Sequence, residues 1–357
     1  MADRHSLEMV AMDRALELAV LGPAHGPNPQ VGCVLLAADG STLAEGRHEG
    51  AGTPHAEAAA LAAARASGAD PTGSTAVVTL EPCTHTGRTG PCTDALIAAG
   101  VTRVVYAVDD PNHAAAGGAH RLAAAGVDVL AGVRRDEGER VLRIWLHALR
   151  TGRPFVTVKI ATTLDGRVAA ADGSSRWITS PEARQHAHRF RAIVDAIAVG
   201  TGTALVDDPA LTARTSDGGL DPHQPLRVVV GHRPVPSTAR LHGPGGELVT
   251  LRTHDVAEVL AQLAAREVRH LLVEGGPGLA AAFLRSGNVD EIHAYIAPVL
   301  LGAGAAAVTD LGIESIDDAL RLRTRQVEVV GPDLLVVAEP LRRTTTMPER
   351  ANAPKET

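Results

Sequence analysis

The stretch that decides the fold of the first half is GTPHAEAAALAAARASG, residues 52–68. Most of its positions carry alanine or another residue of high helix propensity, so we expect a helix over residues 55–67. Two ionisable side chains, His55 and Glu57, nevertheless stand in the first turn. An alanine-rich helix does not need such groups, so these two residues must have a chemical purpose.

On both sides of this helix, apolar residues alternate between helical and strand periodicity. The pattern predicts helices at residues 7–21, 55–67 and 93–100, strands at 31–37, 75–80 and 101–108, and a further short helix and strand within 121–132. This order predicts a mixed sheet with helices on both faces, which is an α/β fold.

The segment RIWLHALRTGRP, residues 143–154, is predicted to be a last helix that leads into a linker with the breakers Gly152 and Pro154, and a second α/β unit follows. Its expected strands lie within residues 155–166, 196–200, 226–231, 247–251, 268–276 and 291–302, its helices within 181–192, 255–266 and 278–287, and a terminal hairpin turns around Gly331 and Pro332. We therefore predict domains at residues 1–150 and 151–341. Residues 342–357 have no apolar periodicity, and we expect them to be disordered.

Composition narrows the class of protein. The chain has 357 residues and a formal net charge of -7, and acidic residues outnumber basic ones in each half, so a nucleic-acid partner is not expected. Three cysteines are too few for a disulfide framework, the N-terminus does not resemble a signal peptide, and no apolar run is long enough to cross a membrane. We expect a cytoplasmic protein with a small-molecule substrate.

The first chemical pattern runs from His55-Ala56-Glu57 through Pro82-Cys83 to Cys92. One imidazole and two thiolates in this order form the signature of a zinc deaminase, in which the glutamate is not a ligand. We therefore expect His55, Cys83 and Cys92 to hold one zinc ion and to leave its fourth position for water. Glu57 would transfer protons.

The same three side chains allow two alternatives. A structural zinc site would close with a fourth protein ligand, and His85 is a candidate, but that role leaves Glu57 without a purpose. Alternatively, the three side chains are unrelated. Cys33 lies within an apolar strand and is expected to be a core thiol.

The segments PNPQVGCVL at 27, GRHEGAGTPHAE at 46, TLEPCTHTGRTGPC at 79 and VVYAVDDPN at 104 resemble the deaminase half of the bifunctional pyrimidine deaminase/reductase of riboflavin biosynthesis. The likeness covers most of residues 7–150, including the eight residues between Cys83 and Cys92, and implies a three-layer cytidine-deaminase-like domain. It further implies that Asn28 and His48 hold the pyrimidine and that His85 and Arg88 approach the ribose phosphate. Gly90, where the family usually has proline, and the segment after Asn112 depart from the pattern.

Two features stand out in the second half. The stretch LLVEGGPGLAAAFL, residues 271–284, predicts a strand that enters glycines and then a helix, a junction that suits phosphate binding. Lys159 lies in an apolar strand, and the only other lysine of the chain is Lys355. Because the chain otherwise uses arginine, we expect that the compact ammonium group of Lys159 has a function that a planar guanidinium would not serve. A tight turn and an ordinary surface lysine are the alternatives.

Residues 158–180, 189–214 and 273–284 resemble the reductase half of the same enzyme, whose fold is similar to dihydrofolate reductase. The resemblance implies an NADPH site lined by Ala161, Trp177, Thr203, Asp207, His232, Gly275, Gly276 and Gly278. It also implies substrate contacts from Ser175, Arg191, Ala210, Leu211, Arg214 and Glu274. Lys159 and Glu274 are the candidates for polarising the ribose and moving protons. Gly231 and His232 depart from the family at the adenosine side of the cofactor.

Together these observations predict zinc-dependent deamination of a pyrimidine ribosylamine 5′-phosphate, followed by NADPH-dependent reduction of its ribosyl group. A homo-oligomer, either a dimer or a tetramer, is also expected. One rival is a cytidine or tRNA-type deaminase fused to an inactive NADPH-binding domain. Another is a zinc-stabilised binding module without catalytic activity.

Overall fold

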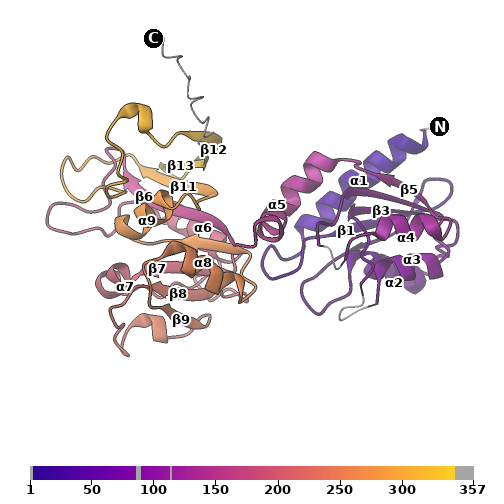
Figure 1. The fold of residues 1–357 in the computed structure, drawn as a ribbon, viewed down its shortest axis with the longest axis horizontal. Helices are drawn as coiled ribbons and strands as arrows, with labels where there is room; N and C mark the ends of the chain where they lie inside the picture. Colours follow the sequence, from indigo (N-terminus) through magenta and orange to yellow (C-terminus); the bar gives the residue numbers. More distant parts are fainter. Residues whose placement is uncertain (1–2, 86–89, 113–114, 342–357) are drawn as a thin grey trace, which may run out of the picture. The chain divides into compact units, whose positions relative to one another are not determined.

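The computed structural model describes residues 3–85, 90–112 and 115–341 (Figure 1). Packing divides them into two compact units. The first contains the described residues up to 156 together with 185–273, and the second contains 157–184 together with the described residues from 274 onward. The boundary expected at residue 150 stays a prediction, and the expected disordered tail lies outside the described residues.

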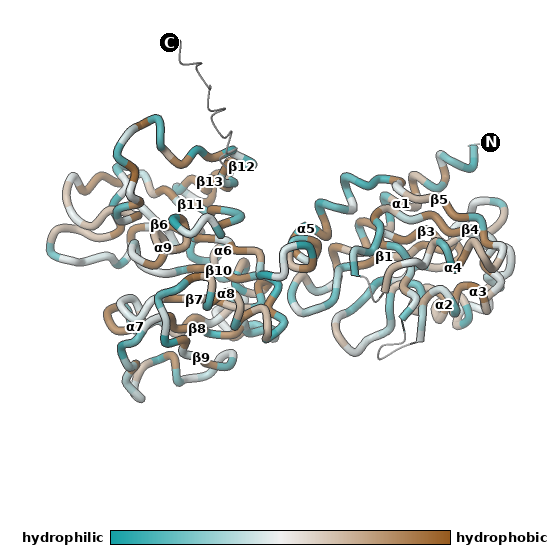
Figure 2. Tube along the Cα trace, in the orientation of Figure 1, coloured by the Kyte–Doolittle hydropathy of each residue, from teal (hydrophilic) through white to brown (hydrophobic). Residues whose placement is uncertain are grey.

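A five-stranded sheet forms the N-terminal part of the first unit. Its strands are β1 (Gly32–Leu36), β2 (Thr42–Arg47), β3 (Thr75–Leu80), β4 (Arg103–Val108) and β5 (Asp128–Ala131), and their order across the sheet is β2-β1-β3-β4-β5. β1 pairs antiparallel with β2 and β3, whereas β3, β4 and β5 are parallel. The central strands β1, β3 and β4 are almost entirely buried and apolar (Figure 2).

The helices of this part are α1 (Arg4–Val20), α2 (Ala56–Ser67), α3 (Cys92–Ala98), α4 (Gly118–Ala124) and α5 (Arg135–Thr151). α1 packs with α5, and α2 packs with α3, which in turn packs with α4. The apolar positions of these helices join those of the strands in one core. α2 ends at Gly68, whose φ of 77° is left-handed and suits glycine.

Two glycines show why α1 and α2 lie on opposite faces of the sheet. A Cβ on Gly32 would stand 2.0 Å from the Ala15 carbonyl oxygen of α1. A Cβ on Gly46, which pairs with Cys33, would stand 2.3 Å from the Ala60 nitrogen of α2. Because Gly32 and Cys33 are neighbours on one strand, they face opposite sides. The first domain therefore has three layers, as expected.

The remainder of the first unit contains four parallel strands. They are β7 (Ala196–Gly200), β8 (Leu226–Val230), β9 (Leu248–Leu251) and β10 (His270–Val273), in the order β10-β7-β8-β9. They alternate with α7 (Thr201–Asp207), the short 3-10 helix η1 (Arg240–His242) and α8 (Val256–Ala264). α6 (Pro181–Arg191) begins in the second unit and ends in the first.

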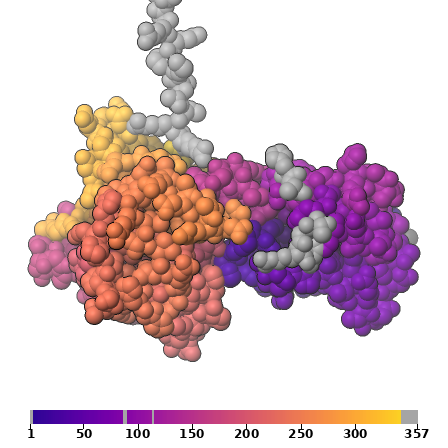
Figure 3. All heavy atoms as spheres, turned by 60° about the horizontal axis from the view of Figure 1, so that its bottom comes forward, coloured from indigo at the N-terminus to yellow at the C-terminus, as the bar shows by residue number. Residues whose placement is uncertain are grey.

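The second unit is built on β6 (Phe155–Thr163), β11 (Glu291–Ala297), β12 (Leu322–Val330) and β13 (Asp333–Pro340), in the order β12-β13-β11-β6. β6 and β11 are parallel, and the other two pairings are antiparallel. α9 (Pro277–Arg285) and η2 (Ile316–Asp318) complete it. β12 and β13 form the hairpin predicted around Gly331, and nearly every residue of β12 is exposed. The C-terminal part of the described chain, which includes this hairpin, is yellow in Figure 3.

Most expected elements are present, and two were missed. β2 was missed because TLAEGR is mostly polar, and α7 because seven residues directly after a strand give little helical periodicity. Within the described ranges, no helix has both the length and the apolar character required to cross a membrane.

Candidate active sites

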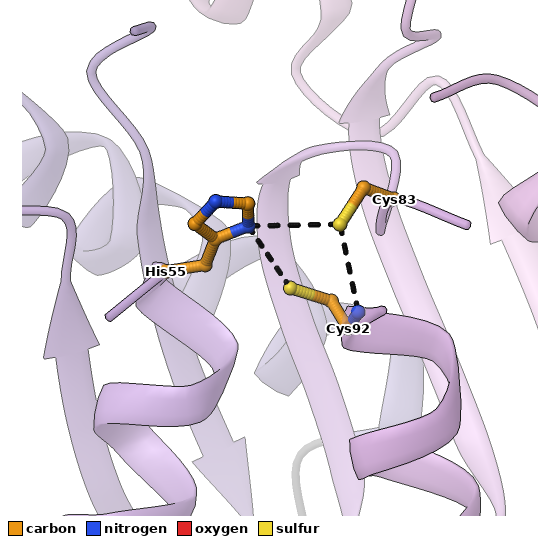
Figure 4. A group of neighbouring side chains, drawn as sticks. All are labelled: His55, Cys83 and Cys92. Carbon is orange, nitrogen blue, oxygen red and sulfur yellow. Dashed lines mark hydrogen bonds between the residues drawn. The ribbon is translucent and has the colours of Figure 1, made fainter. Parts of the chain in front are cut away.

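His55, Cys83 and Cys92 form a cluster in the first unit, and their ligand atoms lie within 4.8 Å of one another (Figure 4). The Nδ1 atom of His55 is 3.2 Å from the Cys92 sulfur and 3.6 Å from the Cys83 sulfur. A tetrahedral zinc ion, with bonds of about 2.0 Å to nitrogen and 2.3 Å to sulfur, separates such atoms by roughly 3.5 Å. The cluster therefore fits zinc.

Local structure brings these side chains together. His55 is the N-cap residue of α2, Cys83 follows β3, and Cys92 is the first residue of α3. The Cys92 backbone N–H donates to the Cys83 sulfur at 3.5 Å. A hydrogen bond from the Cys92 thiol lowers the pKa of Cys83, and the bond to Cys83 raises the pKa of His55. The site already favours the Cys83 sulfur in its thiolate form.

Among the residues with described positions, the cluster has three members, and His85 is not one of them. This arrangement does not provide the fourth protein ligand that a closed structural site requires. Cys33 is fully buried in β1, where burial holds the pKa of its thiol well above the usual range.

Glu57 lies two residues after His55 in the first turn of α2 and is 4% exposed. Burial raises the pKa of its carboxyl group. It lines a cavity of about 170 Å³ together with His55 and Cys83. A buried carboxyl beside a metal site, with access to the same cavity, is placed to exchange protons with a bound molecule.

Asn28 and His48 line the same cavity and contact each other. The Asn28 amide nitrogen is 2.9 Å from His48 Nε2, and His48 Nδ1 is 3.0 Å from the Pro54 carbonyl oxygen. The carbonyl can only accept, so Nδ1 donates to it, and Nε2 accepts from Asn28. His85 also lines the cavity, whereas Arg88 lies outside the described residues.

Glu81 also lines this cavity and was not among the predicted site residues. Its buried carboxylate accepts hydrogen bonds from the backbone N–H groups of Asp110, at 3.1 Å, and Ala119, at 2.9 Å. Glu81 thereby connects the start of α4 to the segment that carries Cys83. The signal was its position within TLEPC, because a charged residue at the end of a buried strand requires partners.

The remaining lining residues that were missed come from distant parts of the chain. They include Asp110, Asn112, Trp145, Leu149 and Arg269. The Trp145 indole N–H donates to the Pro27 carbonyl oxygen at 3.2 Å, which ties α5 to the wall. No local pattern marks Trp145, Leu149 or Arg269, because only the fold brings them to the cavity, whereas Asp110 and Asn112 lie in the segment VVYAVDDPN.

In the second unit, Lys159 on β6 lies near Glu274, which follows β10. The lysine Nζ is 3.8 Å from a carboxylate oxygen of Glu274 and 5.8 Å from the centre of the buried Tyr295 ring. The Glu274 side chain is only 6% exposed. The two predicted residues therefore form an ion pair. The ring of Tyr295, which was not predicted from the sequence, lies next to the lysine.

The predicted glycine junction is present. Gly276 is the N-cap residue of α9, and Gly278 lies in its first turn. Ala161 lies on β6, and Ser175 and Trp177 lie in the loop that follows. Trp177 is 69% exposed, and the guanidinium of Arg184 lies 4.6 Å from the centre of its ring.

The other predicted reductase residues belong to the first unit. Thr203 and Asp207 lie on α7, and His232 packs edge-on against His254. Arg191 donates to the Thr212 carbonyl oxygen, and Arg214 to the Gly218 carbonyl oxygen.

The segment from 208 to 214 has a constrained backbone. Leu211 is buried and has a left-handed φ of 51°, and Ala210 accepts a hydrogen bond from the buried Arg227 at 3.4 Å. The predicted substrate-facing residues Ala210 and Leu211 therefore lie in a segment whose backbone contacts a buried arginine.

Comparison with known proteins identifies the class first. The family model described as "Cytidine and deoxycytidylate deaminase zinc-binding region" matches residues 6–108, and the one described as "RibD C-terminal domain" matches residues 154–336. The chain therefore joins a zinc-dependent deaminase to a reductase.

The family follows from full-length relatives. Riboflavin biosynthesis protein RibD of Mycobacterium tuberculosis is 51% identical over 92% of this chain and 97% of the relative, and RibD of Escherichia coli is 42% identical over 90% and 96%. The crystal structure of a diaminohydroxyphosphoribosylaminopyrimidine deaminase/5-amino-6-(5-phosphoribosylamino)uracil reductase from Thermotoga maritima matches with a TM-score of 0.87 and 32% identity, over 95% of this chain and 100% of that one. The chain belongs to the RibD family.

The protein is thus a bifunctional enzyme of riboflavin biosynthesis that acts on a small pyrimidine. Its cofactors are zinc in the deaminase and NADPH in the reductase. The predicted family, fold class and activities are confirmed. A cytidine or tRNA-type deaminase with an inactive partner domain, and a binding module without activity, are not supported.

Proposed function

We propose that the deaminase acts on 2,5-diamino-6-ribosylamino-4(3H)-pyrimidinone 5′-phosphate. Water supplies the oxygen that replaces the amino group at C2, and ammonia leaves. The reductase then converts the ribosyl group of the product to ribityl. The observation that carries this proposal is the cavity lined by Glu57, Asn28 and two members of the metal cluster, His55 and Cys83.

His55, Cys83 and Cys92 are the ligands that we assign to zinc. When bound, zinc lowers the pKa of a water ligand towards neutrality and so supplies a hydroxide nucleophile. Glu57 accepts the proton that this water releases and delivers it to the departing amine. Its burial next to the cavity keeps bulk water from competing for that proton.

Asn28 and His48 orient the pyrimidine. Because His48 Nδ1 donates to Pro54, its Nε2 accepts from the Asn28 amide nitrogen, and the Asn28 oxygen is directed away from that bond. That oxygen accepts a hydrogen bond from an amino group of the ring. His85 and Arg88 are assigned to the ribose phosphate.

In the reductase, NADPH supplies a hydride to C1 of the ribose in its ring-opened form. Ring opening breaks the bond between C1 and the ring oxygen, passes the amine proton to that oxygen and leaves a C1=N bond. Lys159, paired with Glu274, polarises the ring oxygen for this opening, and the same pair supplies the proton that the nitrogen takes up when the hydride adds to C1. The residues that we assign to the cofactor are Ala161, Trp177, Thr203, Asp207, His232, Gly275, Gly276 and Gly278. Those assigned to the substrate are Ser175, Arg191, Ala210, Leu211, Arg214 and Glu274.

We also propose a homo-oligomer and a cytoplasmic location. The exposed strand β12 carries Val327 and Val329, which are 61% and 70% exposed, and Leu334 of β13 is 40% exposed. Apolar side chains on the surface of an edge strand favour pairing with another copy. The domain limits of 1–150 for the deaminase and 151–341 for the reductase belong to the same proposal.

The test combines metal analysis with two assays on the stated substrate, ammonia release and NADPH oxidation. Glu57→Gln should retain one zinc ion per chain and lose deamination by on the order of a hundredfold or more. The matched control is Glu49→Gln, an exposed carboxylate paired with Arg47. Full deamination by zinc-loaded Glu57→Gln would contradict the proton-transfer role, and a wild-type enzyme without zinc would contradict the site.

A further inference from the structure

The deaminase cavity has an unusual distribution of charge for a site that takes a phosphate ester. Its lining includes three carboxyl groups, from Glu57, Glu81 and Asp110. Arg269 is the one lysine or arginine among its described lining residues. Carboxylates repel a phosphate in a confined cavity, so a cation is required to hold it there.

The backbone of Arg269 is fixed on both sides. Its N–H donates to a carboxylate oxygen of Asp195 at 2.8 Å, and its carbonyl oxygen accepts from the Phe155 N–H at 2.8 Å. Strand β10 begins at the next residue. The base of the Arg269 side chain therefore has a defined position.

The same Asp195 carboxylate also binds a second segment next to the cavity. Its other oxygen accepts a hydrogen bond from the Gly26 backbone N–H, and Pro27 and Asn28 of the cavity follow immediately. One carboxylate thus binds the backbone of both Arg269 and the segment that carries Asn28. The stacked rings of His25 and His223, 3.5 Å apart, strengthen this connection.

The guanidinium of Arg269 has donors available for a ligand. Its Nε atom is buried and has no hydrogen-bond partner among the residues whose positions are described. A buried donor without an acceptor costs free energy, and a bound anion removes that cost. A guanidinium also matches a phosphate group with two parallel hydrogen bonds.

We propose that Arg269, which the sequence places in the reductase half, binds the 5′-phosphate of the deaminase substrate. This inference rests on the substrate given under the proposed function. It makes Arg269 a residue that selects phosphorylated substrate in the first reaction, although it belongs to the part of the chain that performs the second.

The experiment compares the deamination of 2,5-diamino-6-ribosylamino-4(3H)-pyrimidinone 5′-phosphate with that of its dephosphorylated form. For Arg269→Met, KM for the phosphorylated compound should rise by on the order of tenfold to a hundredfold, because a charged hydrogen bond is lost. KM for the dephosphorylated compound should stay at the wild-type value. Arg269→Lys, which keeps the charge, should lose less than Arg269→Met.

Arg266→Met is the matched control, since Arg266 is exposed and lies three residues earlier. Reductase activity of each variant reports whether the chain is folded. Equal KM increases for both compounds, or no change for either, would overturn the inference, as would the same selective loss in Arg88→Met together with an unchanged Arg269→Met. A wild-type enzyme that deaminates neither compound would overturn the proposed substrate, and the inference with it.

Discussion

Replacing Gly118 by alanine tests how closely helix α4 approaches the metal site. A Cβ at Gly118 would stand 1.8 Å from the Pro82 carbonyl oxygen, directly before Cys83, and 3.4 Å from Glu81 Cγ. That separation must open to about 3.0 Å, a movement of roughly 1.2 Å. Metal ligands tolerate deviations of about 0.2 Å, so Cys83 cannot keep its place if Pro82 moves.

The alternative is for α4 to move, which breaks the hydrogen bond from the Ala119 N–H to Glu81. Overpacking of this kind costs about 1 to 3 kcal/mol. We therefore expect the midpoint of thermal unfolding to fall by roughly 5 °C. Zinc affinity should decrease by on the order of tenfold or more.

The assay is zinc content after dialysis against a chelator of known affinity, together with thermal unfolding. Gly90→Ala is the control, because it lies near Cys92 and its added Cβ would meet no described atom within 4 Å. If Gly118→Ala binds zinc and unfolds as the wild type does, the close approach of α4 to Pro82 is wrong, and so is the reasoning built on it.

Three further outcomes are expected. Lys159→Met should slow NADPH oxidation at least about tenfold and leave ammonia release unchanged, and equal losses in both assays would contradict this. Burial and the neighbouring His223 lower the pKa of His25 from 6.5 to about 4, so the unfolded chain takes up the proton first and the wild type loses stability as pH falls from 6.5 to 4. His25→Phe should show a smaller fall in its unfolding midpoint over that range, and an identical fall would refute the assignment. Glu81→Gln places an amide donor against a backbone donor and should cost about 1 to 3 kcal/mol, measured by denaturant unfolding, whereas an unchanged midpoint would show that the bonds to Glu81 do not matter.

The sequence predicts a structural feature well when the residues that form it are close together in the chain. β3 has the predicted limits, because TAVVTL consists of apolar and β-branched residues and is bounded by the polar Ser74 and Glu81. The three metal ligands were identified because the zinc deaminase signature places its histidine and its two cysteines in a fixed order along the chain. β2 was missed because its side chains are mostly polar, and its pairing with β1 rather than its own composition makes it a strand.

The deaminase cavity includes residues that the sequence predicts and residues that it does not. Glu57 and His55 are neighbours on one helix, so a single motif names both. Arg269 and Asp195 lie far from them in the chain, and each looks like an ordinary charged residue at the start of a strand. Only the folded backbone shows that Asp195 holds Gly26 and Arg269 together.

The double attachment of Asp195 bears on protein engineering. A fragment that stops at residue 150 would keep all three zinc ligands and would still lose the acceptor for the Gly26 N–H and Arg269, which lines the deaminase cavity. If either half were replaced by that of a relative, the new chain would need a suitable junction between the halves. It would also need a carboxylate that accepts from the backbone N–H groups of Gly26 and Arg269, as Asp195 does. The deaminase cavity and the contacts behind it therefore include residues from both halves of the chain.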